Sequence, residues 1–290
     1  MGEAWFMGDK REMFDYLLRE KISELDVLLL ARPLEEIASG NSCFGPMREW
    51  NEWLLYLLGV LIDDCLKPKK RRLQELLVTA LMASHSDGLQ SGPYHQFRDD
   101  VLRTLGLVIM DGSKWSHGRV IHERVLIERP YRSDRPWGWW QASGDLSSSL
   151  FLLLKYLEPG QVQHWAVSAF AIADPHWRAQ LLVWLEGARP LLETPGAQPK
   201  EIFMVEPQVD WASSHVLAGN YSADQSDTVP LVPLLPVENK RVFKSTLRQV
   251  LTESTLHDWQ ESIASVEQLI FEAGHITSSS GVLQWLADET

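Results

Sequence analysis

Cysteine is scarce in this chain: Cys43 and Cys65 are the only two thiols among 290 residues. Two cysteines cannot form the disulfide framework that stabilises many small secreted domains. The low cysteine content therefore predicts a reduced environment, and we expect a cytoplasmic protein.

Long hydrophobic runs are also missing. The longest strongly apolar run is Leu150–Leu154, extended by Tyr156 and Leu157, whereas a membrane-spanning helix needs about 20 apolar residues. The first residues, MGEAWFMGDKREMF, contain early acids and no apolar stretch of the kind that a signal peptide carries. We therefore expect neither a membrane span nor a signal peptide.

The motifs of several large enzyme classes do not occur. The sequence has no HExxH zinc motif, no P-loop, no Rossmann glycine fingerprint and no GxSxG nucleophile elbow. His117 and His122 are five residues apart, a spacing that fits neither one helix face nor one strand face. The pair Asp63 and Asp64 lacks the further acid that the class I terpene synthases use to hold magnesium. We therefore expect no metal and no cofactor, and favour a protein that is not an enzyme.

Positive charge is in short supply. The chain has 27 Lys and Arg residues against 39 Asp and Glu residues, a formal net charge of −12. From residue 201 onward, 13 acidic and four basic residues give a net charge of −9. Such a surface repels nucleic-acid phosphates, so the expected partner is another protein, with a basic surface, rather than DNA or RNA. The one basic cluster, Lys67–Arg72, is interpreted as a solvated turn after a helix.

Tryptophan, by contrast, is abundant, with 13 residues. Six of them lie within one stretch: Trp137, Trp139, Trp140, Trp165, Trp177 and Trp184. Large helices bury tryptophans in their core, and protein interfaces use them as anchors. Both interpretations remain open from the sequence.

Apolar residues recur at helical spacing in the first part of the chain. Helices are predicted from residue 10 to the pair Arg32-Pro33, from Pro46 to 66, from 72 to 84 and from Pro93 to 110, with a loop at 40–45. The apolar stripe of the first helix is Met13, Phe14, Leu17, Leu18, Ile22 and Leu25. The stripe of the second is Trp50, Trp53, Leu54, Leu57, Leu58 and Leu61.

The best delimited helices lie between Asp145 and Glu193. Asp145 and Asp174 are predicted N-caps, and Pro175 stands at the first helical position, where its missing N–H costs nothing. A turn at 158–160 divides the first two of these three helices, and short turns make neighbours antiparallel. Further helices are predicted at 238–252, at 256–273 and after residue 280.

Residues 111–144 interrupt the helical pattern. Residues 114–128 fit either a short strand pair or a helix, and 129–140 is too rich in proline and glycine for a regular element. The candidate ligand- or partner-binding residues in this loop are Arg132, Arg135, Trp137, Trp139 and Trp140. They could stack on or clamp a planar or anionic ligand, or the tryptophans could pin the loop onto the helices.

Two of the predicted helices share a pattern. Their residues are Phe97-Arg98-x-x-Val101-Leu102-x-x-Leu105-Gly106 and Trp177-Arg178-x-x-Leu181-Leu182-x-Trp184-Leu185. The pattern resembles the second helix of HEAT-type repeats, in which an aspartate-proline turn such as Asp174-Pro175 commonly precedes the arginine. The two arginines are 80 residues apart, which equals two repeats of about 40 residues. The middle repeat would fall near residue 138, where the sequence reads Trp-Gly-Trp-Trp-Gln.

These observations predict a mainly α fold of antiparallel helical hairpins. A bundle and a short α-solenoid both remain open, with an irregular or minor-β insertion. We expect a helical core domain at 1–193 with the insertion at 111–144, a linker and irregular segment at 194–236, and C-terminal helices at 237–290 packed on the same domain. The favoured function is a non-enzymatic scaffold or protein-interaction protein that presents an acidic, tryptophan-bearing surface. The alternative is an enzyme or small-ligand binder with its site at loop 129–140.

Overall fold

The structure of the protein is a computed structural model. It describes residues 14–44, 48–61, 73–106, 115–116, 119–120, 144–194, 202, 209, 211, 215–217, 233–265 and 280–287. Within these residues the protein is mainly α-helical, as the sequence predicts. No helix in the described ranges is both long enough and apolar enough to cross a membrane.

Helices account for nearly all the described elements. The first are α1 (Tyr16–Arg19), the 3₁₀ helix η2 (Ile22–Glu24), α2 (Val27–Phe44), α3 (Arg48–Leu61), α4 (Leu73–Ser84) and α5 (Phe97–Val101), which continues as the π-helical turn η4 (Leu102–Gly106). Later come α7 (Gly144–Tyr156), α8 (Pro159–Phe170), α9 (Pro175–Glu193), α10 (Val237–Val250), α11 (Glu253–Ala264) and α13 (Ser280–Ala287). Between the two groups, strands β1 (Trp115–Ser116) and β2 (Arg119–Val120) pair antiparallel.

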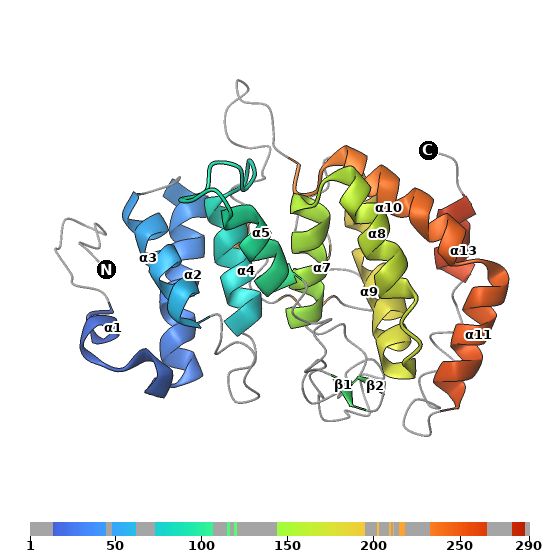
Figure 1. Cartoon of the computed structure of the whole chain (residues 1–290), viewed down its shortest axis with the longest axis horizontal. Helices are drawn as coiled ribbons and strands as arrows, with labels where there is room; N and C mark the ends of the chain where they lie inside the picture. The colour runs from blue at the N-terminus through green and yellow to red at the C-terminus, as the bar shows by residue number, and fades with distance from the viewer. Residues whose placement is uncertain are drawn as a thin grey trace.

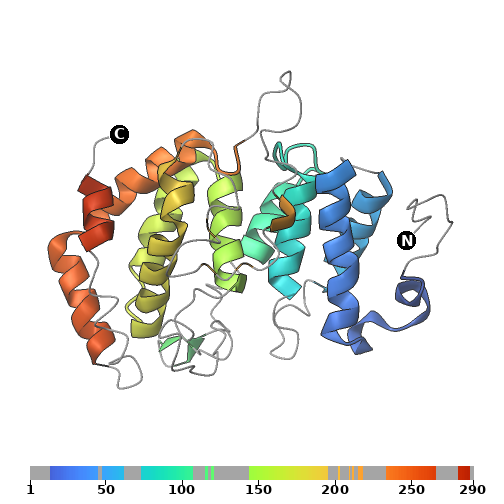
Figure 2. The ribbon, with the colours of Figure 1, turned by 180° about the vertical axis from the view of Figure 1, so that it is seen from behind.

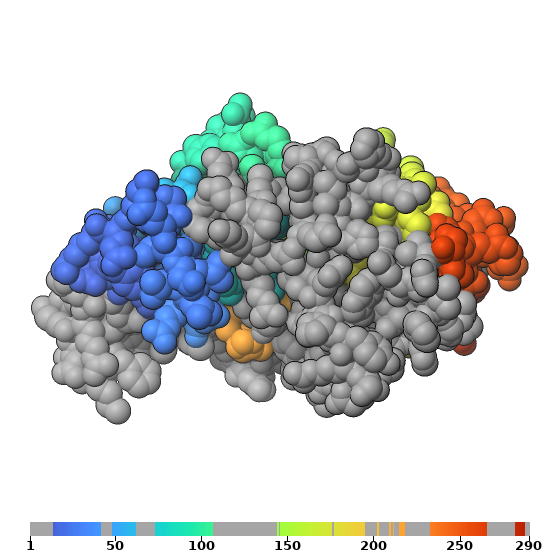
Figure 3. All heavy atoms as spheres, turned by 90° about the horizontal axis from the view of Figure 1, so that it is seen from below, coloured from blue at the N-terminus to red at the C-terminus, as the bar shows by residue number. Residues whose placement is uncertain are grey.

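The helices stand side by side in a row that follows chain order. Figure 1 shows the blue N-terminal helices at one end, α7 near the middle, and the orange and red C-terminal helices at the other end, and the view from behind in Figure 2 agrees. Seen from below, the two ends of the chain's colour range are again at opposite ends of the molecule (Figure 3). The protein is therefore elongated along the direction in which the helices succeed one another.

Several of the closest contacts between helices join elements that are not consecutive in the chain, although α2 also packs on α3 and α7 on η4. Helix α2 packs on α4, α8 packs on α10, and α9 packs on α11. Because the intervening helix lies on the other side, successive helices alternate between two layers. This arrangement is that of hairpins stacked on one another, which buries a continuous core from neighbour to neighbour.

One hydrophobic cluster runs through the whole row, from Leu17 to Leu286. Its C-terminal half is built on aromatic rings. Trp165 stacks on Phe243 at 5.7 Å between ring centroids, and Phe170 stacks on Trp259 at 5.9 Å. Offset stacks of this kind stabilise the core beyond the area they bury. Core packing thus accounts for the tryptophans on α8 and α11.

Helix α7 is buried along most of its length, as is α4. Its apolar residues from Leu150 to Leu154 are each at most 1% exposed, and the three serines at 147–149 in its early turns are 0% exposed. Buried hydroxyls need hydrogen-bond partners. Ser149 donates to the Leu105 carbonyl over 2.8 Å, and Gln74 of α4 donates to the Ser149 hydroxyl. Ser149 therefore fastens the start of α7 to α4 and η4.

The three central helices form as the sequence predicts, with one difference at their start. The Asp174 carboxylate accepts the Trp177 backbone N–H over 3.0 Å, which is an N-cap bond. Glu158 and Gln161 form a capping box at the start of α8. Helix α7 begins at Gly144, so Asp145 lies inside the helix and the predicted N-cap at this residue is wrong.

The sequence predicts that Arg32-Pro33 ends the helix or kinks it, and the first alternative is wrong, because α2 continues through Pro33 to Phe44. Proline has no N–H to donate to the carbonyl four residues earlier, which is that of Leu29. In this structure the Tyr16 hydroxyl donates to the Leu29 carbonyl over 2.7 Å. Helix α1 thus supplies from outside the hydrogen bond that Pro33 cannot make, and α2 remains continuous.

The loop predicted at 40–45 begins inside the same helix. A Cβ on Gly40 would lie 2.9 Å from the ring of Trp50, so glycine is needed there for the close approach of α3 rather than for a turn. The Asn41 amide donates to the Ile37 carbonyl over 2.9 Å and to the Ser84 hydroxyl over 3.0 Å. Both residues are typical of loops, but here they serve helix packing.

Other boundaries differ by smaller amounts. Helix α5 begins at Phe97, four residues after the predicted start at Pro93, because the Phe97 N–H closes a turn onto the Tyr94 carbonyl. At 115–120 the described residues follow the strand alternative, with Trp115 opposite Val120. Helices α3, α4, α10, α11 and α13 lie where helices are predicted.

Candidate functional site

The candidate residues selected from the sequence lie outside the described residues. These are Arg132, Arg135, Trp137, Trp139 and Trp140. The role of loop 129–140 in binding a ligand or partner therefore stays a prediction. The basic cluster Lys67–Arg72 and the histidines at 117 and 122 also fall outside the described ranges.

Among the tryptophan side chains that the structure describes, most are in the core. Six are at most 6% exposed: Trp165, Trp177, Trp184, Trp211, Trp259 and Trp285. Trp50 and Trp53 are partly buried and pack against the core from α3. Helix α3 is thus the described element that brings tryptophan to the surface.

Trp53 lines an open groove at the N-terminal end of the row. The groove has a volume of about 300 Å³ and is lined by Leu18 of α1 and by Glu52, Trp53 and Tyr56 of α3. The rings of Trp53 and Tyr56 meet edge to face, 5.6 Å apart between centroids. Leu18 is 71% exposed and Tyr56 is 42% exposed. We call this feature the α1–α3 groove.

The α1–α3 groove differs from what the apolar stripes predict. The sequence places Leu18 in one apolar stripe with Leu17, Ile22 and Leu25. The other three residues are buried, whereas Leu18 is exposed. On α3, Leu54, Leu57, Leu58 and Leu61 are buried as predicted. Trp53, Tyr56 and Val60 form a second apolar line at i, i+3 and i+7. Two apolar lines on one helix are the signal that could have indicated this groove.

The short helix α1 is firmly attached beside the groove. Leu17 is 1% exposed and belongs to the core, and the Tyr16 hydroxyl is bonded to α2. Partial burial raises the pKa of Tyr16, so this hydroxyl keeps its proton and remains a donor at neutral pH. Leu18, next in sequence and about 100° further around the helix, is exposed while Leu17 is buried.

Exposed ion pairs border the groove. Arg48 pairs with Glu52 at 2.7 Å, and Arg19 pairs with Asp15 at 2.9 Å. Over residues 14–26 and 48–61 the chain carries six acidic and three basic residues, a net charge of −3. Exposed pairs of this kind add little stability and are screened by salt. Each of the two pairs is neutral, so the pairs themselves add no net charge beside the groove.

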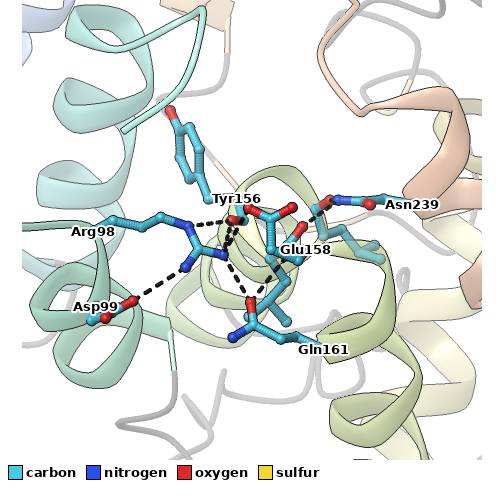
Figure 4. A network of polar contacts seen from close by, with 8 residues as sticks. Arg98, Asp99, Tyr156, Glu158, Gln161 and Asn239 are labelled. Atoms are coloured by element: carbon cyan, nitrogen blue, oxygen red, sulfur yellow. Dashed lines mark hydrogen bonds and ion pairs between the residues drawn. The ribbon is translucent and has the colours of Figure 1, made fainter. Parts of the chain in front are cut away.

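A second set of polar contacts joins the two halves of the row (Figure 4). The Arg98 guanidinium, on α5, donates to the Tyr156 carbonyl at the end of α7 from Nε over 3.2 Å and from Nη2 over 3.0 Å. It also donates to Gln161 of α8 over 2.8 Å. From the other side, Asn239 of α10 donates to the carbonyls of Leu154 and Leu157, each over 2.8 Å.

Most of these contacts are hydrogen bonds to backbone carbonyls at the C-terminal end of α7. The last carbonyls of a helix have no N–H partner within it and carry the negative end of the helix dipole. Here cationic and amide side chains of neighbouring elements donate hydrogen bonds to these carbonyls. Lys240, beside Asn239 in α10, donates to the carbonyls of Leu191 and Thr194 at the end of α9. The first turn of α10 therefore closes the ends of both α7 and α9.

The two arginines of the shared sequence pattern make different contacts. Arg98 reaches from α5 to the end of α7. Arg178, on α9, lies over the ring of Trp259 on α11, with 5.5 Å between its Cζ and the ring centroid. Each arginine thus connects its own helix to a later helix of the row.

No family model, curated protein or solved structure matches this chain.

No group of three or more His, Cys, Asp or Glu side chains within the described ranges could hold a metal ion. Among the described residues, Lys155 of α7 has the largest change in pKa. Burial lowers the pKa of its amine to about 8, and the attraction of Asp87 partly opposes this change. Its amine is 3.2 Å from the Leu234 carbonyl and donates to it. This geometry gives Lys155 a structural contact.

The buried amine of Lys155 predicts an increase of stability with pH. The pKa is about 8 in the folded protein and about 10.4 when unfolded. Charging the amine in the fold thus costs about 3 kcal/mol below pH 8, and this cost disappears as the pH rises to the unfolded value. Lys155→Met removes the cost and also the bond to Leu234, which is worth about 1 kcal/mol. We expect Lys155→Met to be about 2 kcal/mol more stable than the wild type at pH 7.

Urea unfolding of both proteins at a series of pH values checks this prediction. All other titrations are shared by the two proteins, so the difference between them isolates Lys155. The advantage of the methionine variant should fall as the pH rises from about 8 to about 10.4 and turn into a deficit of about 1 kcal/mol, the value of the lost hydrogen bond. A difference that does not change over this interval would contradict the lowered pKa.

Proposed function

We propose that the protein is a non-enzymatic scaffold that presents an acidic, tryptophan-bearing surface to a protein partner. The observation that carries the proposal is the α1–α3 groove, in which Leu18, Trp53 and Tyr56 form an apolar surface at the end of the row. Aromatic side chains in such positions are the usual anchors of protein interfaces. The low cysteine content supports a reduced, cytoplasmic setting.

The architecture supports the same proposal. Hairpins stacked in two layers resemble an α-solenoid more than a closed bundle, which supports a HEAT-like repeat. In such arrays the terminal unit needs a polar outer face to remain soluble when nothing covers it. Here the terminal unit, α1–α3, has exposed Leu18 and Tyr56 on its outside. A partner that covers this end explains why these side chains are apolar.

Site-specific photocrosslinking in the cells that make the protein tests this function. Benzoylphenylalanine in place of Tyr56 reports on the groove, and the same residue in place of Tyr94 is the matched control. Tyr56 is 42% exposed and Tyr94, in the turn before α5, is 52% exposed. We expect a defined protein adduct from position 56 and none from position 94. Absence of any protein adduct, together with turnover of a metabolite by the purified protein, would contradict the scaffold function.

A further inference from the structure

We propose that α13 is a latch, which leaves its seat on α9 and α10 while the rest of the row stays folded, and that the vacated seat binds a helix with the same kind of C-terminal end. The seat is the surface of α9 and α10 on which α13 packs. It is separate from the α1–α3 groove, because Figure 2 shows α13, in red, at the opposite end of the row.

Helix α13 contacts the row through one face. Val282, Trp285 and Leu286 are 3%, 3% and 4% exposed, and their spacing of three and four residues places them on the same side of the helix. On the other side, Gln284 and Ala287 are exposed. The seat therefore already holds an amphipathic helix, and the occupant that fits it is known from the chain itself.

Two cationic side chains of α10 complete the seat. The Arg248 guanidinium donates from Nε to the Leu286 carbonyl in the last turn of α13. The Lys244 ammonium lies over the ring of Trp285, 5.8 Å from the ring centroid. Cations are attracted by the negative end of a helix dipole and by the face of an indole ring. The seat thus recognises an aromatic ring together with the C-terminal end of a helix.

The hold on α13 is weaker than that on the longer helices. Its eight residues form about two turns, and so short a helix is not stable in water without its seat. The Trp285 Nε1 is buried without a hydrogen-bond partner among the described residues, a cost that release removes. Release also returns water to Lys244, which is 9% exposed. A terminal element of this kind opens locally at a lower free energy than the whole fold.

The seat itself is held by contacts that do not involve α13. Phe243 of α10 contacts the rings of Trp165, Phe170 and Trp184. The first turn of α10 also closes the ends of α7 and α9 through hydrogen bonds. We therefore expect α9 and α10 to keep their structure, and the seat its shape, when α13 leaves.

Hydrogen exchange of the full chain, followed by mass spectrometry, tests the release. The amides of 284–287 are the ones that can bond to carbonyls within α13. We expect them to exchange at least about a hundredfold faster than the amides of 243–247 in α10, because local opening exposes them without global unfolding. Equal rates for the two helices would overturn the latch. Exchange of α13 at the rate of an unfolded peptide would overturn its seating.

Two substitutions on α10 test the contacts of the seat. Arg248→Gln removes the bond to the Leu286 carbonyl and should speed the exchange of α13 about fivefold. Arg241→Gln, the matched control, removes an exposed arginine of the same helix that pairs with Glu238, and should leave α13 unchanged. Equal effects of the two substitutions would show that Arg248 acts through its charge alone, and would overturn the assigned contact.

Trp285→Ala provides a chain with a vacated seat. We expect α13 to lose its protection from exchange in this variant while α10 keeps its own. Loss of protection in α10 as well would show that the seat depends on α13, and would overturn the inference. Fluorescence anisotropy then measures binding of a labelled synthetic peptide of residues 280–290. The peptide should bind the variant, and the same peptide with alanine for tryptophan should bind at least about tenfold more weakly.

The wild-type chain gives a quantitative check on the same peptide. Its own α13 competes for the seat, so the affinity is reduced by the fraction of chains that are open. Hydrogen exchange measures this fraction independently. If about one chain in 100 is open, the peptide should bind the wild type about a hundredfold more weakly than Trp285→Ala. Equal affinities for the two chains would place the peptide elsewhere, and no binding to the variant would show that the seat accepts no helix in trans. Either result would overturn the inference.

Discussion

Replacement of Trp211 by alanine is expected to lower the free energy of unfolding by about 4 kcal/mol. The indole is 1% exposed and stacks on Phe151 of α7, with 5.2 Å between ring centroids. Its Nε1 donates to the Thr79 hydroxyl of α4 over 2.8 Å. Alanine would leave a cavity against α7 and remove the link to α4. Urea unfolding followed by far-UV circular dichroism measures the loss.

A conservative variant separates packing from hydrogen bonding. Trp211→Phe keeps a ring against Phe151 and loses the bond to Thr79, whose hydroxyl still donates to the Glu75 carbonyl. We expect this variant to lose about 1 kcal/mol beyond the small change in ring size. A loss below about 1 kcal/mol for Trp211→Ala would show that the residue is not a core anchor.

The importance of Trp211 could not be predicted from its surroundings in the sequence. It lies in the segment 194–236, which is predicted to be a linker and irregular, and few of its neighbours are described. Periodic patterns identify helix faces because apolar residues repeat along them. A single anchor in an irregular segment produces no repeat. Its partners, Thr79 and Phe151, are 132 and 60 residues away.

The N-cap at Asp174 is predictable from the sequence because its chemistry is local, although the same signal fails at Asp145. Asp174 caps α9 through the backbone N–H three residues later, and such a bond depends on adjacent residues alone. Pro33 failed as a helix breaker because the compensating donor, Tyr16, comes from another element. Gly40 failed as a loop residue because its role is the approach of Trp50. Both errors arise from tertiary contacts, which override local propensity.

The groove was missed for a related reason. Trp53 and Leu54 are adjacent in sequence and were assigned to one stripe, yet Leu54 is 0% exposed while Trp53 lines the groove. Which side of a two-sided apolar helix is covered depends on the next packed element. At this end of the row the part of the chain that the structure describes supplies none on one side, and the sequence does not state which helix lies at the end. The predicted acidic, tryptophan-bearing surface stays a proposal, now with a defined location.

Asn239→Asp is expected to destabilise the protein by more than about 4 kcal/mol at pH 7. Asn239 is 3% exposed, and its amide donates to the carbonyls of Leu154 and Leu157 at the end of α7. An ionised carboxylate would face these two oxygens without a proton to give. It would also sit at the negative end of the helix dipole. Asn239→Ala, which removes the donors without adding charge, should cost about 2 kcal/mol.

The effect of Asn239→Asp should depend on pH in a direction that identifies its cause. Burial against carbonyl oxygens raises the pKa of this carboxyl above its unfolded value of about 3.9. The variant therefore binds more protons when folded, and it loses stability as the pH rises from the unfolded pKa towards the folded one. Measured against the wild type, its deficit should be smallest near pH 3, where the protonated carboxyl still donates one hydrogen bond. Gln249→Glu makes the same chemical change on the exposed face of α10 and should show no such dependence. A deficit for Asn239→Asp that is equal at pH 3 and pH 7 would mean that the loss is not electrostatic, and the closure of α7 by α10 would need another explanation.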